Sequence, residues 1–205
     1  MTRGDIPGVI ALQRRAFPKM PPWMPNQLAR HMATFPEGQV VAVDATGRIV
    51  GSASSLIVRW ADYDERASWE EITADGSFRT HDPQRGDTLY GAEIMVDPQS
   101  RGLGVGSKLY EARQAIARLF NLPRMIAGGR IPGYGEVADE MTPEQYVAEV
   151  VAGRRKDQVL SFQLRNGFRV LGVIPSYLAE DKASKGYATL IEWVNPAYHE
   201  VKPAA

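Results

Sequence analysis

A strand, a glycine-rich turn and a helix follow one another without a break in the middle of the chain. They read EIMVDPQSRGLGVG over residues 93–106, and an amphipathic stretch continues to Phe120. The backbone N–H groups that open a helix have no partner within it and lie at the positive end of its dipole, so they bind phosphate oxygens. Glycines let the backbone approach such an anion closely, and successive N–H groups of the turn form a concave nest for it. The stretch therefore predicts an anion site at residues 101–107.

Three phosphate-binding patterns compete for this turn. The P-loop requires G-x-x-x-x-G-K-[ST], a spacing that no glycine pair before Lys108 has. The dinucleotide fingerprint requires G-x-G-x-x-G and an acidic residue about 20 positions later, where this chain has Ile-Ala-Gly at 126–128. The acyl-CoA pattern Q/R-x-x-G-x-G/A is satisfied by Arg101, Gly104 and Gly106. A glycine-rich connection without a ligand stays open as well, because short motifs also match by chance.

Helices and strands alternate on both sides of the turn, and we expect a mixed α+β domain. Apolar spacing, caps and turn residues predict the elements. Two segments, 61–87 and 132–156, look like insertions. The expected helices cover residues 5–17, 26–35, 67–72, the stretch from the turn to 120, 143–151 and 159–165, and the expected strands cover residues 39–43, 49–59, 89–96, 125–127, 168–174 and 187–194.

The segment from Val96 to Gly106 resembles the central motif of the GNAT superfamily of N-acetyltransferases. FQLRNGF at residues 162–168 is similar to that family's helix-then-Gly-Phe motif. The element order matches from the first helix to Trp193, so the resemblance covers nearly the whole chain. Residues 13–18 and 127–134 also resemble the GNAT domain that is fused ahead of carbon–nitrogen hydrolase domains in some proteins. The resemblance implies a single GNAT-like domain over residues 1–205, with a central, mostly antiparallel sheet that is splayed at its central strands and flanked by helices.

The resemblance also implies a co-substrate, acetyl-CoA or another acyl-CoA. Its pantetheine would pair like an extra strand with the backbone of Met95 and Val96, where the central strands part. The implied activity is transfer of the acetyl group to a primary amine of a small molecule or peptide by direct attack. The residues that would hold the pyrophosphate are Arg101, Gly102, Leu103, Gly104, Val105, Gly106 and Ser107.

Two departures from the family pattern bear on the activity. Many members carry a tyrosine four residues before the Gly-Phe pair as general acid, and here that position is Gln163. The family's first strand has almost no counterpart before Asp5, which leaves open whether the N-terminus is complete. Because Gln163 cannot donate a proton usefully, a non-catalytic acyl-CoA sensor is the alternative to an enzyme.

Two further residues are candidates for the chemistry. An amine with a pKa near 10.4 must lose a proton before it attacks a thioester. Glu93, on the strand that leads into the turn, is the carboxylate best placed to take that proton or to bind the amine. Tyr177 is a candidate acid for the leaving thiolate, with solvent and Tyr134 as alternatives.

Composition excludes several other classes of site. The chain has no cysteine, which excludes disulfides and thiolate zinc sites, and its three histidines have no metal-ligand spacing, so we expect no metal. Its formal net charge is zero, which does not suggest a nucleic-acid binder. No apolar run approaches the roughly 20 residues of a membrane helix, and no signal peptide opens the chain. We expect a cytoplasmic protein without a membrane partner, and a homodimer stays open.

The first insertion is acidic. Residues 62–87 contain eight acidic residues and three arginines, which would favour a cationic amine, although a solvated loop is the alternative. Trp60 and Trp69 lie in or beside it and either line a pocket or pack in the core.

Overall fold

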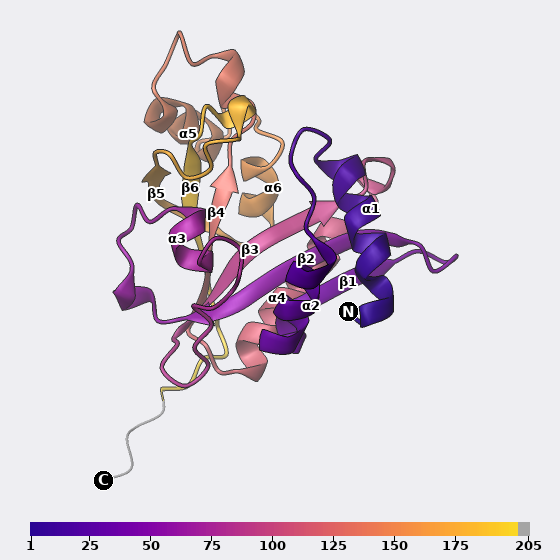
Figure 1. Ribbon diagram of the computed structural model, residues 1–205. Coiled ribbons are helices and arrows are strands. Elements are labelled where there is room, and N and C mark those ends of the chain that lie inside the picture. The colour runs from indigo at the N-terminus through magenta and orange to yellow at the C-terminus, as the bar shows by residue number, and fades with distance from the viewer. Residues whose placement is uncertain (201–205) are drawn as a thin grey trace.

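A six-stranded sheet forms the centre of the molecule in the computed structural model, which describes residues 1–200. The strand order is β1-β2-β3-β4-β6-β5, and only β3 and β4 run parallel. This confirms the expected mixed α+β fold with a mostly antiparallel sheet (Figure 1). The strands are β1 Gln39–Val43, β2 Ile49–Val58, β3 Thr88–Val96, β4 Arg124–Arg130, β5 Arg169–Ile174 and β6 Ala188–Val194.

Helices cover both faces of this sheet, so every residue of β2 is buried. The helices α1 and α2 lie on one face, and α4 lies on the other (Figure 1). None of the helices in residues 1–200 is both long and apolar enough to cross a membrane. The helices are α1 Ile6–Ala16, α2 Pro25–Thr34, α3 Trp69–Thr73, α4 Val105–Leu119, α5 Pro143–Val151 and α6 Leu160–Arg165.

Local sequence signals explain where the helices begin. α5 starts as predicted: Thr142 accepts a hydrogen bond from the backbone N–H of Gln145, and Pro143 occupies the first turn. α4 turns a stripe of buried side chains toward the sheet, with Leu109, Tyr110 and Ile116 among them. One member of that stripe is Arg113, which is fully buried despite its charge.

One expectation about the glycines after Ala127 is wrong, and the first insertion contributes to the core. β4 does not stop at Ala127 but continues through Gly128 and Gly129 to Arg130. A Cβ at Gly128 would overlap the ring of Tyr177, and one at Gly129 would overlap the side chain of Gln163, so both glycines leave room for packing. The first insertion is also more than a solvated loop, because Ile72 and Phe78 within it are buried in the core.

The two central strands separate along their length, as the expected splay requires. β3 and β4 pair only from Thr88 opposite Arg124 to Tyr90 opposite Ile126, although both strands continue beyond these pairs. A bulge interrupts the pairing of β3 with β2, since Ser54 is opposite Glu93 and Ser55 is opposite Gly91. Ala92 is therefore the extra residue, and the bulge lies where the splay opens.

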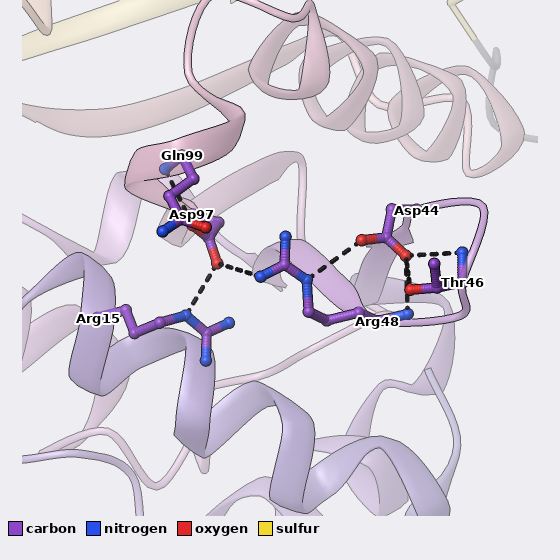
Figure 2. A network of polar contacts seen from close by, with 6 residues as sticks. All are labelled: Arg15, Asp44, Thr46, Arg48, Asp97 and Gln99. Atoms are coloured by element: carbon purple, nitrogen blue, oxygen red, sulfur yellow. Dashed lines mark hydrogen bonds and ion pairs between the residues drawn. The ribbon is translucent and has the colours of Figure 1, made fainter.

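A polar network ties the end of β3 to α1 and to the β1–β2 turn (Figure 2). Asp97, with a side chain that is 1% exposed, accepts hydrogen bonds from the N–H of Gln99 at 3.0 Å and from Arg15 Nε at 2.8 Å. Arg48 Nη1 lies 3.9 Å from the same carboxylate, and Arg48 Nε donates to Asp44. Burial alone would raise the pKa of Asp97, but the Gln99 amide and the two guanidinium groups outweigh it and lower the pKa.

We expect Asp97→Ala to lower the free energy of unfolding by about 2 kcal/mol at pH 7, because it removes a turn cap and two partly exposed ion pairs. Asp97→Asn keeps an acceptor for the Gln99 N–H and should cost about half as much. Since the folded-state pKa is lowered, the carboxylate stabilises the fold above its unfolded pKa of about 3.9 and stops doing so as the pH falls through the folded value. Urea unfolding at pH 7 and below pH 4 measures both effects. Equal unfolding free energies for wild type and Asp97→Ala at pH 7 would contradict this account.

Candidate active site

The glycine-rich turn leads directly into α4. After β3 the chain makes a short 3-10 helix, Pro98–Ser100, and reaches the first residue of α4 at Val105. Gly102 and Gly104 adopt φ angles of +78° and +80°, which L side chains rarely take. The first hydrogen bond of α4 runs from the N–H of Lys108 to the carbonyl of Gly104. The N–H groups of Val105, Gly106 and Ser107 thus lie in the first turn of α4, where N–H groups have no hydrogen-bond partner within the helix.

A cavity of about 470 Å³ lies between this turn and the open edge of β3. Of the nine residues predicted to bind the cofactor, eight line it, and Leu103 does not: this residue is 75% exposed. The sequence interpretation missed Phe162 and Arg165 of α6, which also line the cavity. A Cβ at Gly106 would lie 2.7 Å from the ring of Phe162, so this glycine also provides room for helix packing.

A second cavity, of about 330 Å³, adjoins the first. Phe17, Ile94, Tyr110 and Val159 line both, so the two spaces meet between α1, β3 and α4. Glu93 and Tyr177, the two predicted catalytic residues, both line the second cavity.

Glu93 lies at the bulge of β3. Its Oε2 accepts a hydrogen bond from Trp23 Nε1 at 2.7 Å, which links it to the loop between α1 and α2. Burial raises the pKa of Glu93 to about 7, against the opposing effects of the Trp23 hydrogen bond and the positive charge of Arg113. A carboxyl group with this pKa can exchange a proton near neutral pH.

Arg113 supports the bulge from the opposite side of the sheet. Its guanidinium donates to the carbonyl oxygen of Ser54 at 2.7 Å and to that of Glu93. These carbonyls flank the irregular pairing, so the arginine satisfies backbone acceptors where the strand is distorted. In the sequence, Arg113 stands out as the one charged residue in the apolar stripe of α4. The two carbonyls to which it donates could not be predicted from that position.

The tyrosines around the second cavity keep their protons at neutral pH. The hydroxyl of Tyr177 lies 2.5 Å from that of Tyr90, and burial raises the pKa of Tyr177 to about 12. Burial also raises the pKa of Tyr110. Gln163, at the position where many relatives carry the acid, donates to Tyr110 Oη at 3.4 Å. Tyr134 is buried against Tyr146 and Tyr187 and does not line either cavity.

Two tryptophans complete the wall of the second cavity. Trp69 of the first insertion lines it, whereas Trp60 packs in the core. Trp23, which the sequence interpretation did not single out, comes from the proline-rich loop before α2. Within residues 1–200, no three histidine, aspartate or glutamate side chains gather as a metal site.

Comparisons with known proteins agree with this geometry. The chain matches the model of the Acetyltransferase (GNAT) family over residues 6–132. It is 47% identical to the probable hydrolase YhcX of Bacillus subtilis strain 168 over 194 residues, which cover 95% of this chain and 37% of YhcX. The chain thus spans little more than a third of that relative, in agreement with the narrower resemblance of residues 13–18 and 127–134.

A second relative and a solved structure match along most of their length. The uncharacterized N-acetyltransferase YkwB of the same Bacillus subtilis strain is 41% identical over 201 residues, covering 96% of this chain and 88% of YkwB. The structure of the GNAT-like decarboxylase GphF in complex with isobutyryl-CoA has a TM-score of 0.79 and 26% identity, and covers 95% of this chain and 96% of GphF. The family model covers more than half of the chain and the relatives cover nearly all of it, so the chain belongs to the GNAT acetyltransferase family.

Proposed function

We propose that the protein transfers an acetyl group from acetyl-CoA to a primary amine. The observation that carries this proposal is the pair of adjoining cavities, one beside free helix amides and the other beside a carboxyl group with a pKa of about 7. The structural relative GphF, solved with an acyl-CoA, supports the choice of donor. The first cavity is therefore assigned to CoA and the second, hereafter the acceptor cavity, to the amine.

In this proposal the turn and β3 hold the donor. The first-turn amides of α4 bind the pyrophosphate, and the residues from Arg101 to Ser107 surround it. Pantetheine lies along Met95 and Val96, whose backbone faces the gap that β4 leaves. The thioester then reaches the place where the cavities meet.

Glu93 prepares the amine. It takes a proton from the ammonium group, and the neutral nitrogen attacks the thioester carbonyl carbon. The carbon–sulfur bond breaks, CoA leaves as a thiolate that takes up one proton, and the nitrogen loses a second proton to water as the amide forms. A backbone N–H of Met95 or Val96 is assigned to the developing oxyanion, a kind of donor whose loss costs about 3 kcal/mol in other enzymes.

The proton for the thiolate can come from Tyr177 or from solvent. Tyr177 is protonated at neutral pH, but its hydroxyl is already paired with Tyr90. A Tyr177→Phe enzyme with an unchanged kcat would assign this step to solvent.

The proposal predicts binding of acetyl-CoA in the micromolar range, much weaker binding of NADH and ATP, and release of CoA thiol when primary amines are added. Calorimetry measures the first two, and a thiol reagent measures the third. Binding of acetyl-CoA without thiol release from any amine would favour the sensor over the enzyme. NADH binding under conditions where CoA gives no heat would overturn the assignment of the first cavity.

GphF is described as a GNAT-like decarboxylase, which raises decarboxylation as one further activity to test. The acceptor cavity of this chain does not favour it, because Glu93 would repel the substrate carboxylate once it is ionised, above a pH of about 7. Incubation with malonyl-CoA is the direct check, and the proposal expects no release of carbon dioxide.

A further inference from the structure

The charges around the acceptor cavity are unequally available to a ligand. Four charged side chains line it: Glu93, Glu180, Arg113 and Arg130. Arg130 is held by Asp181 through two hydrogen bonds of 2.6 and 2.5 Å. Within residues 1–200, Glu180 has no ion-pair partner.

Arg113 is committed through one of its three nitrogens. Its Nη2 donates to two backbone carbonyls, whereas Nη1 and the buried Nε have no acceptor among the described residues. A carboxylate is normally held by two parallel N–H groups of one guanidinium, and Arg113 cannot offer that pair. The cavity thus presents two carboxyl groups and no guanidinium that is free for bidentate binding.

The aromatic walls favour the same sign of charge. Trp23 and Trp69 lie with ring centroids 5.9 Å apart, and each is anchored through its Nε1–H to the bulge of β3. Trp23 donates to Glu93, and Trp69 donates to the carbonyl of Ala92 at 2.9 Å. Trp23 is also held by the ring of His31, at 5.0 Å in an edge-on arrangement. Indole faces attract cations and provide a large apolar surface.

The volume of the acceptor cavity limits the size of its ligand. About 330 Å³ lies at the low end of the roughly 300–1,000 Å³ found for small-molecule pockets. The lining also includes apolar side chains of the loop after α1, Met20 and Pro21 among them. A small ligand with an apolar body fits this lining.

We infer that the acceptor is a small cationic amine with an apolar body and no carboxylate, its ammonium group at Glu93 and its body against Trp23 and Trp69. This inference rests on the proposed function and narrows its substrate class: amines without a carboxylate are accepted, and amino acids are not. The raised pKa of Glu93 agrees with this inference. A bound ammonium group would lower that pKa, so Glu93 should release a proton when the amine binds near pH 7.

The probes are phenethylamine and L-phenylalanine, which share ring, spacing and amino group and differ by one carboxylate. Each is titrated by calorimetry into the protein saturated with CoA, and each is assayed with acetyl-CoA. We expect phenethylamine to bind at least a hundredfold more tightly than phenylalanine, with a heat at pH 7 that depends on the ionisation enthalpy of the buffer. Equal or tighter binding of phenylalanine, or no binding of phenethylamine, would overturn the inference.

A pair of variants tests the aromatic wall. Trp69→Leu should weaken phenethylamine binding about tenfold and leave the affinity for CoA unchanged. Trp69→Phe keeps an aromatic ring and should weaken phenethylamine binding less. Equal affinities in wild type and Trp69→Leu would also contradict the inference. Because binding is measured without turnover, absence of acetylation would count against the proposed function alone.

Discussion

Gly104→Asp is expected to weaken CoA binding by at least two orders of magnitude while the protein stays folded. Gly104 is the residue just before α4, and a Cβ there would meet nothing within 4 Å, so the cost is confined to its φ of +80°. Aspartate tolerates this conformation better than most residues do. Its carboxylate would lie at the free amides that are assigned to the pyrophosphate. Two unit charges about 4 Å apart repel by about 4 kcal/mol at an effective dielectric constant of 20, which corresponds to nearly three orders of magnitude in affinity.

Two variants separate charge from backbone strain. Gly104→Asn has nearly the same shape and the same backbone cost but no charge, so it should retain most of the affinity. Gly153, with a φ of +72° and open space around it, lies after α5 and away from both cavities, so Gly153→Asp should leave CoA binding unchanged. Calorimetry at low and high salt completes the test, because the loss should shrink as salt screens the repulsion. Equal CoA affinity in folded Gly104→Asp and wild type would show that the turn is only structural.

The turn could be predicted because everything it needs is local. The end of β3, the two glycines with positive φ and the first turn of α4 lie within about a dozen consecutive residues. The free amides of a helix start are a property of the backbone, so they follow once the helix is placed. Leu103 shows the limit of such local reasoning: its position in the motif is right, but which way its side chain points depends on the path of the turn.

The acceptor cavity could not be predicted in the same way, since its walls come from distant parts of the chain. Trp23 and Trp69 meet Glu93 only after the loop before α2 and the first insertion fold onto β3. The bulge at Ala92 changes which face of β3 the following side chains occupy, and nothing in the alternation of apolar residues marks it. Gly128 and Gly129 were misinterpreted for a related reason, because their use is to accommodate Tyr177 and Gln163 rather than to end a strand.

The raised pKa of Glu93 has a consequence for stability that needs no substrate. The folded state holds the proton of Glu93 up to a pH of about 7, whereas the unfolded chain releases it near the usual value of 4.5. The wild-type protein therefore loses stability as the pH rises between these values. Glu93→Gln can still accept the Trp23 hydrogen bond but does not lose stability in this way. Its free energy of unfolding should exceed that of wild type by an amount that grows from pH 5 to pH 7. A difference in unfolding free energy that does not change with pH would contradict the raised pKa.

The same substitution, although it stabilises the fold, should slow the reaction. We expect Glu93→Gln to lower kcat on the order of a hundredfold near pH 7 while the affinity for CoA stays nearly the same, because a positioned base is worth about that much. Wild-type kcat/KM should rise with pH through about 7 as Glu93 loses its proton, and the variant should lack this step. The deficit of the variant should shrink at higher pH, where more of the amine is already neutral.

Glu180→Gln is the matched control, since Glu180 is the other carboxylate of the acceptor cavity and has no assigned role in proton transfer. It should raise KM for the amine and leave kcat nearly unchanged. If Glu93 only attracts the ammonium group, Glu93→Gln should behave like Glu180→Gln, with a higher KM and a normal kcat. Wild-type values of both constants in Glu93→Gln would remove Glu93 from the reaction and leave deprotonation of the amine to water.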